Sequence, residues 1–161
     1  MSKKLRSLLV TFVMLSLCNG ASAESNNPFI GTWDIDFQQS EFGNSTVPKN
    51  LSRTYFDHGD GTYTFIVVET NPDGSLSGTT SHYSYSGEKY AIASLDELDQ
   101  AVISYNKIND TTVEYTVYLN GEVQQIGAKF ISPNYEQLTI AIQFPNSEQG
   151  NQVLRFNRRR D

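Results

Sequence analysis

Hydrophobic and polar side chains alternate with a period of two along most of this chain. The clearest runs are residues 113–119 and 138–144, where every second residue is apolar or aromatic and most residues between are polar. Because successive side chains of a strand point to opposite faces of a sheet, these runs predict half-buried β-strands. Only residues 40–42 and 95–99 leave room for a helical turn.

Turn-forming residues separate the strands at short, even intervals. Asn120-Gly121 is the strongest of these signals, because a two-residue type I′ turn needs positive φ at both central positions and these residues tolerate it. Clusters of Asn, Asp, Gly, Pro and Ser lie between the other runs, so consecutive hairpins are expected. The predicted strands are residues 30–38, 51–57, 62–70, 77–85, 89–93, 100–106, 111–119, 122–131, 136–144 and 151–158.

Sequential antiparallel strands of this length either close into a barrel or pack as two sheets. Closure removes the unpaired strand edges that otherwise invite aggregation. The sequence therefore predicts an all-β fold, a single antiparallel up-and-down β-barrel of about eight to ten strands.

The first 23 residues have the features of a cleavable secretory signal peptide. Lys3, Lys4 and Arg6 precede an apolar run at residues 8–17, and Ala21-Ser22-Ala23 provides a small-residue cleavage site. The apolar run is shorter than the about 20 residues that a membrane-spanning helix needs. We therefore expect a periplasmic or secreted protein that does not insert into the membrane after cleavage.

Cleavage after residue 23 leaves 138 of the 161 residues, 24–161, which is enough for one barrel domain with its own core. Cys18 is the only cysteine, and it lies within the predicted signal. Lipid anchoring there is disfavoured, because lipoprotein signals prefer a small residue before the cysteine and Leu17 stands in that place. The mature chain then has no thiol for a disulfide, a metal site or catalysis.

Charge and motifs exclude several function classes. The net charge of −6 becomes −9 once the three basic residues of the signal are removed, since that segment holds no acidic residue. An acidic surface repels phosphate backbones, which argues against nucleic acid as a partner. The sequence has no phosphate loop, nucleophile elbow or paired-histidine motif, so we expect no metal and no cofactor.

The two histidines carry the only hint of catalysis. His58 lies in an Asp-His-Gly-Asp-Gly segment and is expected in a solvated turn. His82 is expected on an exposed strand face, with Tyr83 and Tyr85 pointing inward. The inverted alternation would place His82 in the barrel as a candidate acid or base.

Residues 29–36, Phe-Ile-Gly-Thr-Trp-Asp-Ile-Asp, resemble the Gly-x-Trp opening of lipocalins and related calycin barrels. The resemblance implies that Trp33 closes one end of the barrel and that a late arginine, Arg155 or Arg158, packs across it. Strand alternation assigns Arg158 to the face of Leu154 and Phe156, which makes it the better partner of Trp33.

The chain is also similar to small exported bacterial proteins known only as lipocalin-like. Residues 39–42, Gln-Ser-Glu-Phe, and residues 85–90, Tyr-Ser-Gly-Glu-Lys-Tyr, carry that similarity. It supports the fold rather than a particular function, because this group shares no named activity.

Aromatic residues on the predicted strands give a barrel many ring faces and hydroxyl groups, which suits a small apolar or amphipathic ligand. Alternation selects as candidate cavity walls Phe65, Tyr83, Tyr85, Tyr115, Val117, Phe130, Ile140 and Ile142. A register error of one residue would turn a whole strand over.

Three functions fit this pattern. The leading hypothesis is an exported protein that binds a small apolar or amphipathic molecule in its barrel. The first alternative is an isomerase, cyclase or hydratase that acts on an apolar metabolite through His82. The second is a filled barrel that acts as a structural module.

Overall fold

The computed structural model describes residues 26–95 and 100–160. The predicted signal peptide with Cys18, and most of the predicted turn at 95–99, lie outside the described residues. Within the described ranges, no helix has the length and apolar character needed to cross a membrane.

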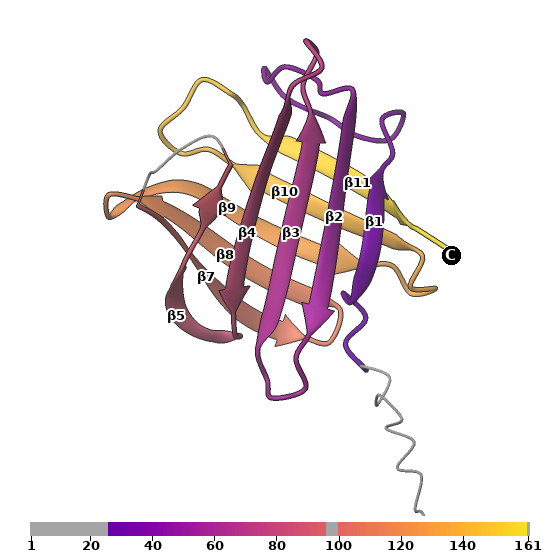
Figure 1. Ribbon diagram of the computed structural model, residues 1–161, viewed down its shortest axis with the longest axis vertical. Coiled ribbons are helices and arrows are strands. Elements are labelled where there is room, and N and C mark those ends of the chain that lie inside the picture. Colours follow the sequence, from indigo (N-terminus) through magenta and orange to yellow (C-terminus); the bar gives the residue numbers. More distant parts are fainter. Residues whose placement is uncertain (1–25, 96–99, 161) are drawn as a thin grey trace, which may run out of the picture.

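The described residues form one antiparallel sheet (Figure 1). Its strands in chain order are β1 (Gly31–Ile35), β2 (Asn50–Asp57), β3 (Tyr63–Thr70), β4 (Leu76–Tyr83), β5 (Ser86–Ala91), β6 (Ala93–Ser94), β7 (Ala101–Asn109), β8 (Thr112–Leu119), β9 (Glu122–Ile131), β10 (Gln137–Gln143) and β11 (Gln152–Arg158). Along the sheet the order is β5-β7-β8-β9-β10-β11-β1-β2-β3-β4-β6, so chain neighbours pair almost throughout. The predicted all-β meander is confirmed.

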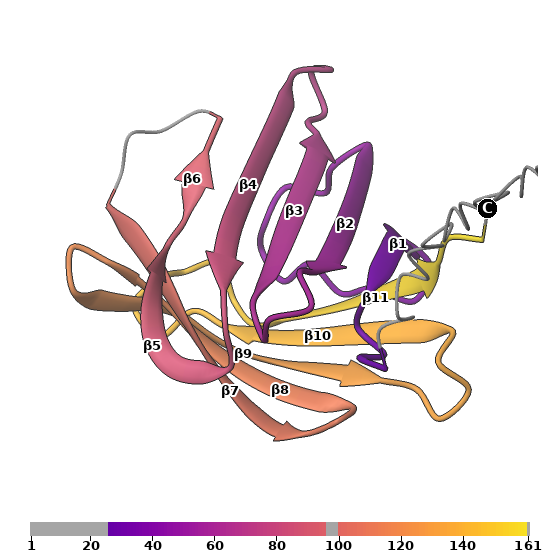
Figure 2. The ribbon, with the colours of Figure 1, turned by 60° about the horizontal axis from the view of Figure 1, so that its bottom comes forward.

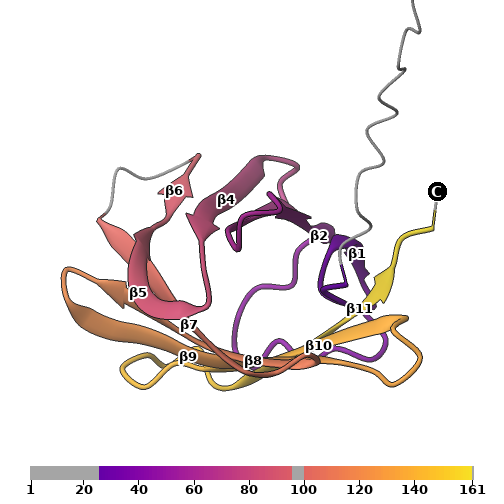
Figure 3. The same cartoon turned by 90° about the horizontal axis from the view of Figure 1, so that it is seen from below.

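The sheet curls into a nearly closed barrel because the strands at its two ends are consecutive in the chain (Figures 2 and 3). β5 pairs with β7, whereas β6 pairs with β4 through Thr79 and Thr80. The strand predicted at 89–93 is therefore divided into two, which raises the strand count above the expected eight to ten. Residues 40–42 form no helical turn, and Glu41 makes an isolated bridge to Val153 instead.

One end of the barrel is filled by aromatic side chains. Tyr83 lies at the centre of this tyrosine cluster, with its ring centroid 4.3 Å from that of Tyr105, 5.8 Å from that of Tyr63 and 5.7 Å from that of Tyr85. The apolar core continues along the inner faces of β8, β10 and β11. Interior space lies toward the other end, where β2 begins and β3 ends.

Candidate functional site

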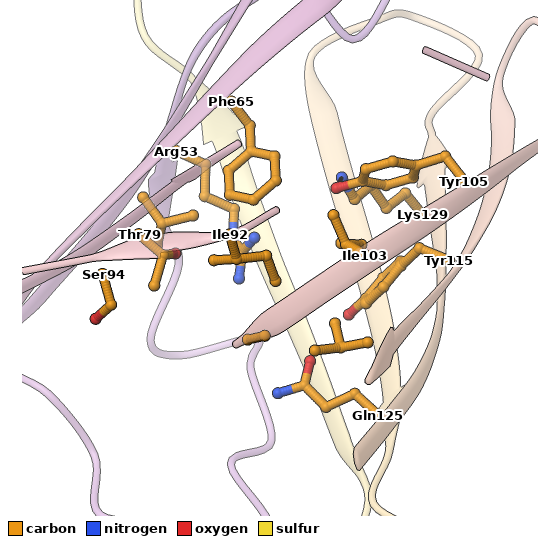
Figure 4. A pocket seen from close by; sticks show the side chains of 13 residues that line it. Arg53, Phe65, Thr79, Ile92, Ser94, Ile103, Tyr105, Tyr115, Gln125 and Lys129 are labelled. Carbon is orange, nitrogen blue, oxygen red and sulfur yellow. Dashed lines mark hydrogen bonds between the residues drawn. The ribbon is translucent and has the colours of Figure 1, made fainter. Parts of the chain in front are cut away.

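A cavity of about 280 Å³ opens inside the barrel beyond the tyrosine cluster (Figure 4). It is lined by Arg53, Phe65, Val67, Thr79, Ile92, Ser94, Ala101, Ile103, Tyr105, Tyr115, Val117, Gln125 and Lys129. The wall is mainly apolar and aromatic with a few polar groups, which is the usual composition of a small-molecule site.

An adjoining space of about 300 Å³ shares Arg53, Val67, Thr79 and Gln125 with the first cavity. It extends beneath the segment between β1 and β2, residues 36–49, which supplies part of its lining. The Gln152 side chain holds this segment by donating hydrogen bonds to the Phe42 carbonyl at 3.2 Å and to Ser45 Oγ at 2.7 Å. The interior space therefore continues around Arg53 to a cover that is anchored to β11.

Lys129 is the most unusual group at the cavity. It lies on the inner face of β9, is only 3% exposed, and donates a hydrogen bond from Nζ to Tyr105 Oη at 3.0 Å. Aromatic rings surround the amine, with centroids 4.5 Å (Tyr105), 4.6 Å (Tyr55), 5.5 Å (Tyr115) and 5.8 Å (Phe65) from Nζ. The ion pairs within the described ranges are formed by Lys107, Arg159 and Arg160, so no carboxylate neutralises Lys129 there.

Burial lowers the pKa of Lys129 well below its ordinary value, and the positive charge of Arg53 adds to this effect. The facing rings attract a cation and act in the opposite direction, but a cation–π contact is weaker than the cost of removing an ammonium from water. The amine of Lys129 therefore loses its proton at a lower pH than a lysine amine in water does.

Arg53 supplies the second basic group of the cavity. It lies on β2 between inward-facing Leu51 and Tyr55, with its guanidinium carbon 5.5 Å from the centre of the Phe156 ring. Figure 4 shows its guanidinium projecting into the space opposite Lys129. Its Nε atom is buried without a hydrogen-bond partner, as is Tyr55 Oη. Such orphaned polar atoms are costly in a core and are unusual in a native fold.

Trp33 and Arg158 close the end of the barrel that lies opposite the start of β2 and the end of β3. Trp33 is fully buried, and the guanidinium carbon of Arg158 lies 4.1 Å from the centre of its ring. The same guanidinium donates hydrogen bonds to three backbone carbonyls, those of Pro28, Ile30 and Tyr135, at 2.6, 2.8 and 2.7 Å. Arg155 instead points outward and donates to the Gln39 carbonyl. The alternation correctly assigned Arg158 to Trp33.

No sequence-family model and no curated protein matches this chain. Several solved structures share its fold. A point mutant of the fluorescent protein UnaG has a TM-score of 0.59 at 14% identity, covering 83% of this chain and 98% of that protein. As-p18, an extracellular fatty acid binding protein, has a TM-score of 0.59 at 11% identity, covering 83% of this chain and 97% of its own.

A third match is the amine-binding protein of Rhodnius prolixus in its tryptamine complex, with a TM-score of 0.51 at 13% identity over 86% of this chain and 67% of that one. This chain has the fold of a calycin-type β-barrel. At these identities the likeness establishes the fold alone, and the chemistry of this barrel rests on its own residues.

Most of the predicted wall residues lie inside the barrel, but at different depths. Phe65, Tyr115 and Val117 line the cavity, and Ile142 lines the adjoining space. Tyr83 and half-buried Tyr85 belong to the tyrosine cluster below the cavity, whereas Ile140 is fully buried in the core.

The prediction that Phe130 faces inward is wrong. Phe130 is 42% exposed on the outer face of β9. Phe130 and Ile131 are consecutive apolar residues, and only one of two neighbours can face the core of a strand. Ile131 does so, together with Lys129 two positions before it.

Arg53 and Lys129 were absent from the predicted set because alternation was read through apolar residues alone. The signal was nevertheless present, since Arg53 shares strand parity with Leu51 and Tyr55, and Lys129 shares it with Ile131. A basic residue at an inward position of a strand is the pattern that would have identified both.

Both histidines lie on the outside of the barrel. His82 is exposed, as favoured from the sequence, and Thr64 Oγ1 lies 3.3 Å from its Nδ1 and 2.9 Å from His58 Nε2. The inverted alternation that would have made His82 a cavity acid or base is therefore not observed. Over the described ranges, no group of three or more metal-ligating side chains forms.

The lowered pKa of Lys129 predicts a specific pH dependence of stability. Between that lowered pKa and 10.5 the unfolded chain holds a proton that the folded chain has lost. The free energy of unfolding should therefore rise with pH, by up to about 1.4 kcal/mol per pH unit, relative to that of Lys129→Met. Above about pH 10 both proteins should lose stability, because burial raises the pKa of Tyr55, Tyr105 and Tyr115 and their unfolded forms ionise first.

Urea unfolding of wild type and Lys129→Met at matched pH values measures this difference. The tyrosines titrate in both proteins, so the difference isolates the lysine. Parallel pH profiles of the two proteins would contradict a depressed pKa at Lys129.

Proposed function

We propose that the protein is exported and binds a small amphipathic molecule with an acidic head group inside its barrel. The observation that carries the proposal is the Arg53 guanidinium, which projects into the cavity (Figure 4) and forms no ion pair with the described carboxylates. A cation held in an apolar enclosure favours an anion there more strongly than a solvated surface cation does.

The surroundings of Arg53 support this preference. Glu69 also lines the space next to Arg53, but partial burial raises its pKa and the Arg53 charge offsets this only in part. Lys129 forms the opposite wall, and Gln125 and Thr79 lie between the two spaces. A carboxylate would thus meet one fixed cation and several hydrogen-bond donors, while the aromatic wall would contact its apolar part.

Two further observations agree with binding by an exported protein. Residues 1–23 carry the signal-peptide pattern described above. As-p18, which shares the fold, is an extracellular fatty acid binding protein. The cavity also makes the filled-barrel module less suitable, because a filled barrel leaves no lined interior space.

Displacement of 1-anilinonaphthalene-8-sulfonate tests the proposal. Decanoate should displace this anionic probe at least about tenfold more effectively than decanol, because only the acid can pair with Arg53. Arg53→Met should weaken decanoate binding by about tenfold or more and leave decanol binding nearly unchanged.

Arg155→Met is the matched control, because Arg155 lies on the outer face of β11. Equal affinity for the acid and the alcohol in wild type, or equal losses in both arginine variants, would contradict an acid-binding cavity.

A further inference from the structure

Lys129 differs from the other lysines of the described chain. Lys49, Lys89 and Lys107 are exposed, whereas Lys129 is buried in a wall of the cavity. A charged amine at such a place adds nothing to an apolar core and is costly to bury. Binding of an acid by Arg53 does not account for the burial of the Lys129 amine, so a separate role for Lys129 is needed.

We propose that Lys129 forms a reversible covalent imine with an aldehyde or ketone that enters the barrel. This inference rests on the binding cavity of the proposed function, but it does not depend on the preference for an acidic head group. It makes the protein a carrier of reactive carbonyl compounds.

The environment of Nζ favours the neutral, nucleophilic amine. The charged and titratable groups that face it are Arg53 and Tyr55 from β2, Tyr105 from β7 and Tyr115 from β8. Arg53 repels a positive charge on the amine, and burial raises the pKa of the three tyrosines, which keeps them uncharged. Phe65 completes the ring of neighbours. A desolvated lysine beside another cation is the arrangement that activates an amine for attack on a carbonyl.

The groups needed for the reaction are present. The Nζ lone pair forms the new C–N bond, and the carbonyl π electrons move to oxygen, which takes up a proton to give a carbinolamine. Loss of water then forms the C=N bond, so that the two amine hydrogens leave with the carbonyl oxygen. No oxidant or reductant is required. Tyr105 Oη, 3.0 Å from Nζ and protonated, is placed to give a proton to the departing oxygen and to recover one from nitrogen.

The carbonyl compound would lie among the aromatic rings of the cavity. Tyr115 and Phe65 flank the amine, and Ile103 and Val117 extend the apolar wall toward the opening. A flat, conjugated aldehyde suits these surfaces, because ring faces stack well on planar molecules.

Reductive trapping with trans-cinnamaldehyde tests the proposal. The protein is incubated at pH 7 with about one equivalent of the aldehyde and sodium cyanoborohydride, and peptide mapping then locates the reduced adduct. We expect Lys129 to carry at least about tenfold more adduct than any other lysine, because Lys129 lines the cavity that would hold the aldehyde, whereas Lys49, Lys89 and Lys107 are exposed. Adducts spread evenly over the exposed lysines, or absent from Lys129, would overturn the inference.

Two variants strengthen the test. Lys129→Met should abolish the dominant adduct, while Lys89→Met, which removes an exposed lysine, should leave it unchanged. The mapping in wild type decides the question even if Lys129→Met does not fold. Failure of the two proposals is distinguishable: displacement of 1-anilinonaphthalene-8-sulfonate by decanoate without a Lys129 adduct rejects the imine alone, and the absence of both rejects the binding cavity as well.

Discussion

Replacing Gly127 with alanine should destabilise the protein by about 3 kcal/mol, near the upper end of the usual cost of overpacking a core. Gly127 on β9 pairs directly with Tyr115 on β8, and a Cβ atom at Gly127 would overlap the ring and hydroxyl of Tyr115. The ring has little room to move, because Tyr105 lies beside it with ring centroids 5.9 Å apart. Urea unfolding followed by circular dichroism measures the loss.

A double-mutant cycle tests whether the Tyr115 ring, rather than the backbone at Gly127, is the cause of this destabilisation. Gly127 does not have positive φ, so the strand geometry itself accepts alanine. In a Tyr115→Ala background the same Gly127→Ala change should therefore cost less than about 1 kcal/mol. Equal costs in the two backgrounds would mean that the Tyr115 ring is not the obstacle.

Gly127→Ala should also weaken ligand binding if it folds. Tyr115 lines the cavity, so displacing its ring would alter the space that a ligand would occupy. The glycine thus affects the cavity wall, through Tyr115, as well as the packing of two strands.

Replacing Arg158 with alanine should destabilise the protein by about 2 to 4 kcal/mol, because charge-assisted hydrogen bonds and a stacked aromatic contact are lost together. The carbonyls of Pro28, Ile30 and Tyr135 lose their donor, and the Trp33 ring loses its cover. Trp33 is the only tryptophan of the chain. Its emission should therefore shift to longer wavelength and become accessible to acrylamide quenching.

Arg155→Ala is the matched control on the same strand, since the Arg155 side chain donates a single hydrogen bond on the outer face and its backbone hydrogen bonds are kept in alanine. It should cost less than about 1 kcal/mol and leave Trp33 emission unchanged. Arg158→Lys should recover only part of the loss, because an ammonium cannot reproduce the planar set of donors of a guanidinium. Similar losses in Arg155→Ala and Arg158→Ala would contradict the role assigned to Arg158.

The two ends of the barrel thus have different characters. At the Trp33 end, hydrogen bonds and ring contacts satisfy the groups that close the fold. At the cavity end, buried Lys129 and half-buried Arg53 have no anionic partner in an ion pair with the described chain, which is unfavourable for stability alone. Polar groups that reduce stability in this way are typical of functional sites.

Local sequence was sufficient to place the strands. Alternation and turn residues such as Asn120-Gly121 depend on neighbours in the chain, so the hairpins lie close to where they were predicted. The same local rule put Arg158 on the face of Phe156, opposite Trp33, because parity along a strand is fixed by its geometry. The all-β barrel and its closing arginine were determined at this level.

The cavity was decided only by tertiary structure. Parity states which residues share a face, but the packing of distant strands decides which face turns inward. On β9 this packing turned Lys129 inward and Phe130 outward. The register between β8 and β9 also shifts between Val117 and Tyr118, so the alternation does not run unbroken along the whole pair of strands. Lys129 gains its aromatic surroundings from β2, β3, β7 and β8. Desolvation by side chains so far apart in the chain has no signature in the sequence around Lys129, because it arises only when the barrel closes.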